Sequence, residues 1–128
     1  MKITALNPSI ASPHAPELIA LFEDLGFKRA HTKTNIDGKD VTNVDLKYGE
    51  DFRVNVAQTD EFDRDTTIIR VNVRDFDEAY DYFISKGFKN AQGDKIIHTD
   101  SSKAAYLVSP TGFGIGLTYH IRKEDKDQ

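Results

Sequence analysis

The second half of the chain repeats the order of elements that the first half suggests, and this repeat constrains the fold more than any other feature. Two apolar helical segments end in the same way, at Gly26-Phe27-Lys28 and at Gly87-Phe88-Lys89. Glycine often follows the last residue of a helix because it adopts a left-handed conformation without strain. We therefore expect each half to contain a strand, a helix and three further strands.

In the first half, a helix is expected from Pro16, whose missing N–H suits a first helical turn, to Gly26. One helical face is indicated by apolar residues at the spacing i, i+3, i+4 and i+7, namely Leu18, Leu21, Phe22 and Leu25. Strands are predicted at residues 2–10, 27–34, 41–48 and 52–57. Pro8 favours an edge or a strand end for the first of them, because proline cannot donate a hydrogen bond.

In the second half, a β-branched strand at residues 67–73 precedes a helix that Asp77 is expected to cap and that ends at Ser85. Its apolar face is predicted to contain Ala79, Tyr80, Phe83 and Ile84. Strands are predicted at residues 95–99, 104–108 and 113–120. The whole chain, 1–128, then forms one α+β domain: a module at about 1–58, an acidic linker at about 59–65, a module at about 66–121 and a disordered tail at about 122–128.

Composition excludes several classes of function. The net charge is −4 and the 17 Lys and Arg residues are scattered, which argues against nucleic acid as a partner. The absence of cysteine excludes disulfides and a cysteine nucleophile. No run approaches the roughly 20 apolar residues of a membrane span and no signal region follows Met1, so we expect no membrane partner and a cytoplasmic protein.

Three segments carry a resemblance to a known family: Phe-Glu-Asp-Leu-Gly-Phe at 22–27, Asp-Phe-Asp-Glu-Ala-Tyr at 75–80, and Ser-Pro-Thr-Gly-Phe-Gly-Ile-Gly-Leu at 109–117. Together with the repeat, they resemble the vicinal oxygen chelate superfamily of glyoxalases, bleomycin resistance proteins and extradiol dioxygenases. The resemblance implies two modules whose mixed sheets curl around a concave pocket, a homodimer, and a small molecule as partner. Many enzymes of that family hold a divalent metal with His, Gln and Glu side chains.

The positions of those ligands can be compared with this chain. The family's glutamate falls at Gly116 and its histidine near Ile68, while the first strand offers Asn7 and the strand at 52–57 offers no carboxylate. Amides alone hold a divalent metal poorly, so we expect no metal and no cofactor. The four histidines share no ligand spacing, although His98 lies on a strand that would border the pocket in relatives.

Strand alternation separates the side chains that face the helices from those on the opposite face. Phe52, Val54, Val56, Phe113, Ile115 and Leu117 are assigned to the helical face, as are Ile69, Val71 and Val73. By resemblance the opposite face is the concave one, and with His98 it supplies the predicted ligand-binding residues: Asn7, Arg53, Asn55, Arg70, Asn72, His98 and Thr118. Ser9 and His120 lie on the same face. Two arginines suit a carboxylate or phosphate. No catalytic residue is identified.

Alternatives remain open at this point. Arg53 and Arg70 could instead pair with acids such as Asp45 or Glu50 and only solvate the sheet. Tyrosines at 48, 106 and 119 suit pocket walls or the core. The leading hypothesis is a metal-free protein that binds a polar or anionic small molecule. The alternatives are a metal-dependent lyase, isomerase or dioxygenase with displaced ligands, and a ferredoxin-like regulatory dimer, which does not explain three strands after each helix.

Overall fold

The computed structural model describes residues 1–33, 43–98 and 101–120, so the predicted tail at 122–128 lies outside the described residues. The helices are α1 (Ala15–Asp24) and α2 (Phe76–Ser85). The strands of the first half are β1 (Ile3–Ser12), β2 (Lys28–Lys33), β3 (Asn43–Tyr48) and β4 (Phe52–Gln58). Those of the second half are β5 (Thr66–Val73), β6 (Lys89–Asn90), β7 (Ile97–His98), β8 (Ser102–Val108) and β9 (Gly114–His120). The predicted α+β plan of two strand–helix–strand–strand–strand modules is confirmed.

The chain divides into two compact units, and the boundary runs through the first strand. One unit comprises residues 7–68, and the other combines residues 69–128 with the first six residues. In the second of these, the backbone N–H of Arg74 donates to the carbonyl of Lys2 at 3.0 Å, which holds the start of β1 beside the end of β5. The units are called the 7–68 unit and the 69–128 unit below.

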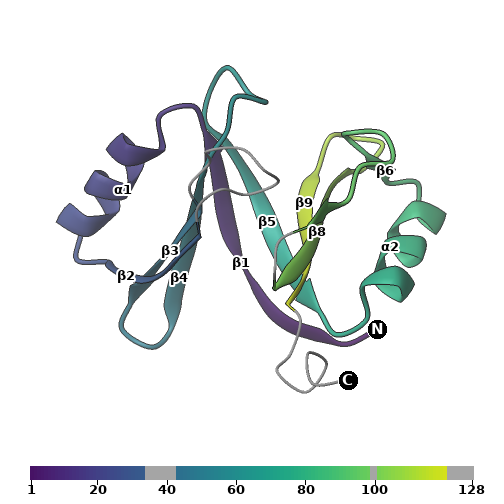
Figure 1. The fold of residues 1–128 in the computed structure, drawn as a ribbon, viewed down its shortest axis with the longest axis horizontal. Helices are drawn as coiled ribbons and strands as arrows, with labels where there is room; N and C mark the ends of the chain where they lie inside the picture. Colours follow the sequence, from purple (N-terminus) through teal and green to yellow (C-terminus); the bar gives the residue numbers. More distant parts are fainter. Residues whose placement is uncertain (34–42, 99–100, 121–128) are drawn as a thin grey trace. The chain divides into compact units, whose positions relative to one another are not determined.

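The 7–68 unit has a mixed sheet in the order β2-β3-β4-β1, with α1 against one face (Figure 1). β1 runs parallel to β4, and the pairing begins at Ser9, directly after Pro8, so the proline takes no part in this ladder. The helix and sheet enclose an apolar cluster formed by Ala15, Ile19, Val44, Leu46, Val54 and Val56. Burial of this cluster is the main source of the unit's stability.

The 69–128 unit has the order β5-β9-β8-β6, with β7 also paired to β8 and with α2 against one face (Figure 1). β5 runs parallel to β9, as β1 does to β4, so the repeat extends to strand direction. Its core contains Val71, Val73, Phe76, Ala79, Ala105, Leu107, Ile115 and Leu117. Neither helix of the described residues is long and apolar enough to cross a membrane.

The repeated glycine–phenylalanine pair closes both helices with the same hydrogen bonds. Gly26 has φ +107° and donates to the carbonyl of Glu23, while Phe27 donates to the carbonyl of Phe22 at 3.0 Å. Gly87 and Phe88 repeat both bonds at the end of α2. This is the Schellman arrangement, and its apolar contact joins the rings of Phe22 and Phe27 with centroids 5.3 Å apart.

The helical faces differ from the sequence prediction at their exposed edges. Leu21 and Leu25 are 50% and 59% exposed, because α1 is rotated so that Ala15 and Ile19 meet the sheet instead. In α2, Ile84 is 40% exposed for the same reason. In α1 the spacing i, i+3, i+4 and i+7 is satisfied by two faces, one that begins at Ala15 and one that begins at Leu18.

Other differences lie where local hydrogen bonds decide the structure. The N-cap of α2 is Asp75, not Asp77: its carboxylate accepts from the N–H of Glu78 at 3.1 Å. Within the described residues, the strand predicted at residues 95–99 is limited to β7, since residue 99 lies outside them, and the unpredicted β6 precedes it. Asn90 explains this interruption, because its side chain donates to the carbonyl of Lys95 at 2.9 Å and accepts from the N–H of Gln92.

Two aromatic residues assigned to the helical face lie outside the core. Phe52 is the first residue of β4 and is 62% exposed, and Phe113 precedes β9 and is 52% exposed. Both belong to the ends of strands, beyond the residues that the helices cover, so alternation alone could not bury them.

Candidate functional site

The predicted ligand-binding residues fall into two groups, one in each unit. Asn7, Arg53 and Asn55 belong to β1 and β4 of the 7–68 unit. Arg70, Asn72, His98 and Thr118 belong to β5, β7 and β9 of the 69–128 unit.

Asn55 lies at the centre of a hydrogen-bonded row on the face of its sheet opposite α1. It is paired in register with Ser9 on β1 and with Asp45 on β3. Its Oδ1 accepts from the hydroxyl of Ser9 at 2.7 Å, and its Nδ2 donates to Asp45 Oδ1 at 2.8 Å and to Asn43 Oδ1. The residue is 2% exposed. Because the protein itself occupies both ends of this amide, Asn55 has a structural role in the free protein.

The other two predicted residues of this unit behave differently from Asn55. Asn7 is 7% exposed, and its Nδ2 donates to the carbonyl of Pro8 at 2.9 Å. Arg53 is exposed and makes no ion pair within the described part of the chain. Glu50, one of the acids that could have paired with Arg53, forms an ion pair with Lys47 at 3.0 Å.

Arg70, Asn72 and Thr118 come together on the face of the other sheet that is turned away from α2. Asn72 is in register with Thr118 across the parallel pair β5–β9, and Arg70 is in register with Gly116. Thr118 is 9% exposed. The Oδ1 atom of Asn72 is buried and has no hydrogen-bond partner. A buried carbonyl oxygen without a donor is energetically costly.

Tyr106 extends this group by one strand. It lies opposite Gly116 in the β8–β9 register, and Gly116 lies opposite Arg70 in the β5–β9 register. Arg70, Gly116 and Tyr106 therefore form one row across three strands. Burial raises the pKa of Tyr106 above its ordinary value of 10.0, and its hydroxyl therefore stays protonated near neutral pH. The sequence indicated the tyrosine but not its position, which depends on the register between two strands.

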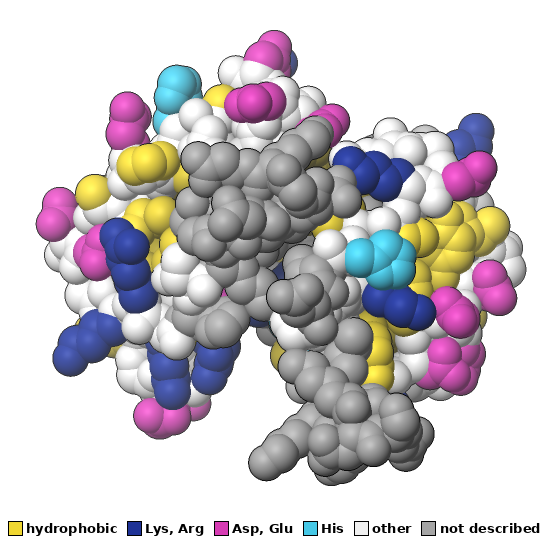
Figure 2. Space-filling model, viewed as in Figure 1, with side chains coloured by type: hydrophobic (Ala, Val, Ile, Leu, Met, Phe, Trp, Pro, Cys, Tyr) yellow, Lys and Arg dark blue, Asp and Glu magenta, His cyan; other side chains and the backbone are white. Residues whose placement is uncertain are grey.

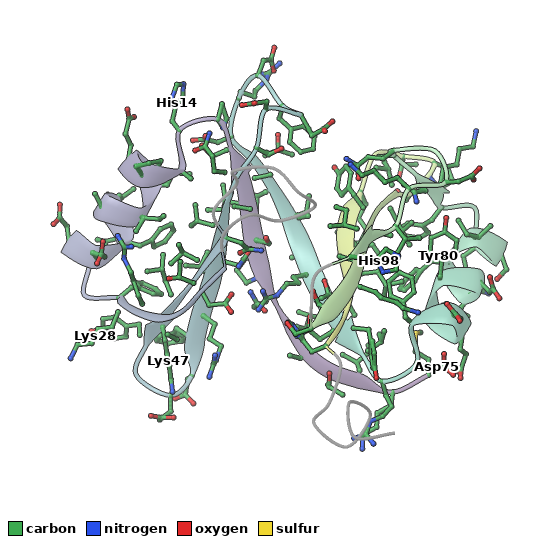
Figure 3. The ribbon with its side chains drawn as sticks, viewed as in Figure 1. His14, Lys28, Lys47, Asp75, Tyr80 and His98 are labelled. Carbon is green, nitrogen blue, oxygen red and sulfur yellow. The ribbon has the colours of Figure 1, made fainter. Side chains whose placement is uncertain are left out.

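The structure does not bring His98 to this group. It is exposed and is in register with Lys103 on β8. Figure 3 labels its position in this unit. On β8, Lys103 shares the helical face with the core residues Ala105 and Leu107, so His98 points to that face. Ile97 and Ala104 belong to the opposite face, which carries Asn72.

The residues at the expected metal positions do not fit a metal ion. Asn55 on β4 is paired with Ser9 on β1, and Gly116 on β9 is paired with Arg70 on β5, so Asn55 and Gly116 occupy equivalent positions in the two sheets. Two residues before Ser9 and Arg70 lie the other two equivalent positions, Asn7 and Ile68. These positions offer two amides that are hydrogen-bonded within the protein, an aliphatic side chain and a glycine. Among the described residues, no group of three or more His, Cys, Asp or Glu side chains is arranged to hold a metal.

A further set of residues was missed by sequence reasoning. Lys28, Lys47 and Arg53 are direct neighbours across β2, β3 and β4. Of these three residues, only Arg53 was predicted to bind a ligand. Strand alternation shows which face a side chain is on, but not which residues of neighbouring strands stand beside it.

Comparison with known proteins shows similarity in structure rather than in sequence. The sequence matches no protein-family model and no curated protein. A methylmalonyl-CoA epimerase from Mycobacterium tuberculosis superposes with a TM-score of 0.69 at 17% identity, covering 97% of this chain and 93% of that one. A glyoxalase/bleomycin resistance protein/dioxygenase superfamily member from Vibrio splendidus gives 0.58 at 14%, covering 92% and 99%. A Streptomyces coelicolor methylmalonyl-CoA epimerase variant in complex with 2-nitronate-propionyl-CoA gives 0.65 at 15%, covering 94% and 100%.

The paired strand–helix–strand–strand–strand modules and these neighbours define the vicinal oxygen chelate fold. The fold that the sequence resemblance implied is confirmed. At identities below one fifth, the similarity establishes the fold and leaves the activity to the residues of this chain.

Proposed function

We propose that this protein binds a small polar or anionic molecule, without a metal, on the sheet face of the 69–128 unit that carries Arg70, Asn72 and Thr118. The observation that supports this most directly is the buried Oδ1 of Asn72, which has no donor. A bound ligand that supplies a hydrogen-bond donor would satisfy it, and the protein would gain the hydrogen bond on binding.

The neighbouring side chains indicate the kind of ligand. Arg70 brings a positive charge two residues before Asn72 on β5, and Thr118 brings a hydroxyl across from Asn72. Gly116 contributes no side chain between Arg70 and Tyr106. A molecule with a carboxylate or phosphate next to a hydroxyl or amide donor matches these groups, because the anion suits the guanidinium and the donor suits Asn72.

The comparisons add one class of candidate. A similar structure from Streptomyces coelicolor contains 2-nitronate-propionyl-CoA, so acyl-CoA thioesters that carry a carboxylate belong with hydroxy acids and dicarboxylates among the compounds to test. The expected metal positions of this chain hold no acidic side chain or histidine, which supports binding that needs no divalent ion.

A thermal-shift series tests the proposal. Each compound is added with a chelator and, separately, with a divalent metal, because a ligand that binds only the folded state raises the melting temperature. We expect a shift with an anionic compound in the presence of chelator, abolished by Asn72→Ala and by Arg70→Ala. The matched control is Arg74→Ala, which removes the same charge from an exposed residue that follows β5.

Two results would contradict the proposal. One is a shift that appears only with metal and disappears with chelator, which would favour the metal-dependent enzyme. The other is a shift that survives Asn72→Ala. A second variant tests the reasoning without any ligand: Asn72→Leu should leave the free protein as stable or more stable, because it removes a buried Oδ1 that has no hydrogen-bond donor among the described residues.

A further inference from the structure

Three cationic side chains form a row across neighbouring strands of the 7–68 unit. Lys28 on β2 lies opposite Lys47 on β3, and Lys47 lies opposite Arg53 on β4. Directly opposed residues share a face of the sheet. Figure 2 shows Lys and Arg side chains gathered at one end of this unit, and Figure 3 labels Lys28 and Lys47 there. The row lies on the face turned away from α1, as Asp45 and Asn55 do.

Little negative charge balances this row. Glu50 pairs with Lys47 at 3.0 Å, and among the described residues Lys28 and Arg53 have no ion pair. Asp45 lies one row further along the face, where it accepts from Asn55 Nδ2 at 2.8 Å. Like charges directly opposite one another on neighbouring strands destabilise a sheet. The free protein therefore carries an unfavourable arrangement that an anion would relieve.

The backbone under the row is fixed by aromatic packing on the other face. Each cation is next in sequence to an aromatic residue, and the rings of Phe27, Tyr48 and Phe52 follow one another with centroids 5.5 and 6.1 Å apart. Phe27 is in turn held by the Schellman closure of α1. These contacts hold the three strand ends, and with them the backbone positions of the three cationic residues, in place.

We propose that Lys28, Lys47 and Arg53 form a binding site for a polyphosphate group, such as a pyrophosphate or the diphosphate of a nucleotide. The outer Cα atoms are two strand spacings, about 10 Å, apart, and the side chains are long enough to converge on two adjacent phosphates. Three cations and one carboxylate leave an excess of positive charge that matches a multiply charged anion better than a single carboxylate. This site is additional to the function proposed above and uses none of the residues on which that proposal depends.

Isothermal titration of the full chain with inorganic pyrophosphate, and separately with ADP, tests the site. We expect saturable binding to the native protein that weakens as salt concentration rises. Lys28→Gln and Arg53→Gln should each weaken it about tenfold or more, the usual effect of losing one charge-assisted hydrogen bond. Tighter binding of ADP than of pyrophosphate would identify a nucleotide as the natural source, and equal affinities would identify the phosphates alone.

The matched control is Arg29→Gln. Arg29 follows Lys28 in sequence but belongs to the opposite face, where it pairs with Glu23 at 3.3 Å. This variant changes the net charge by the same amount and should leave the affinity unchanged. Equal weakening by Arg29→Gln would show only a general attraction of anions and would overturn the proposal, as would the absence of saturable binding at millimolar pyrophosphate.

Stability without ligand gives an independent readout. Lys28→Gln should raise the melting temperature at low salt, because it removes the repulsion with Lys47, and the gain should disappear at high salt. Arg29→Gln should give no such gain, since it breaks an ion pair. If Lys28→Gln lowers the melting temperature at low salt, the repulsion does not exist and the argument for the site fails.

Discussion

Asn55→Ala should be among the most destabilising single substitutions on the polar face of the 7–68 unit. The substitution removes a side chain that is 2% exposed and that joins β1, β4 and β3 in one row. The hydroxyl of Ser9, itself 7% exposed, loses its acceptor at 2.7 Å. Asp45 loses a charge-assisted hydrogen bond from Nδ2 at 2.8 Å. Both partners remain in the protein and no group replaces the amide.

The size of the effect follows from these partners. A buried hydroxyl left without its partner costs about 1 kcal/mol, and a hydrogen bond to a charged carboxylate contributes about 2 kcal/mol. We therefore expect a loss of about 3 kcal/mol in the free energy of unfolding. For a domain of this length that corresponds to a fall of about 10 °C in melting temperature.

Urea unfolding followed by circular dichroism measures the loss, and a double-mutant cycle identifies its source. Ser9→Ala alone should cost about 1 kcal/mol, and combined with Asn55→Ala it should add only a few tenths of a kcal/mol, because the shared hydrogen bond is already lost. A loss below about 1 kcal/mol for Asn55→Ala would refute the reasoning. It would mean that this amide is not held by the protein and would return Asn55 to the ligand-binding candidates.

Three further predictions concern other features. Gly26→Ala should cost more in unfolding free energy than Gly49→Ala, by about 1 kcal/mol or more, because both have positive φ but only at Gly26 would the new Cβ meet a ring carbon, at 2.9 Å. Asp75→Ala should cost about 1 kcal/mol in urea unfolding and Asp77→Ala clearly less, since only Asp75 caps α2. Alkaline titration of tyrosine absorbance should show one late group that Tyr106→Phe removes. Since the folded pKa of Tyr106 is raised, its contribution to stability is present below pH 10.0 and is lost as the pH rises further, so Tyr106→Phe should resist alkaline unfolding better.

The fold was predictable because several local signals agreed. The repeated Gly-Phe closure, the helical spacing and the alternation in β5 and β9 all indicated the same two modules, and the structure confirms them. Errors appeared where two readings satisfied the same pattern. The spacing of Leu18 and Phe22 is shared by two faces of α1, and only packing on the sheet decided that Ile19 rather than Leu21 is buried. In α2 the predicted cap was Asp77, whereas the carboxylate that accepts from Glu78 N–H is that of Asp75, two residues earlier.

The candidate site was predictable only as a face of a sheet. Alternation places Asn55 and Asn72 on equivalent faces, but it does not show that the first is fully hydrogen-bonded and that the second has a buried oxygen without a donor. That difference depends on which side chains stand opposite, Asp45 and Ser9 in one sheet and Thr118 in the other. Register across strands is a tertiary property, and for the same reason the lysines beside Arg53 could not be foreseen.

The path of β1 has a consequence for the order in which the molecule can form. Residues 7–68 are contiguous, so every contact inside that unit becomes available once the ribosome has released them. The other unit needs the first six residues together with residues from 69 onward, as the hydrogen bond from Arg74 to Lys2 illustrates. All residues of the 7–68 unit are therefore synthesised before the residues from 69 onward, with which residues 1–6 make their contacts. When the 69–128 unit forms, residues 1–6 must pair with residues that follow residue 68. This pairing closes a loop formed by residues 7–68, and that loop is a compact unit rather than a free coil.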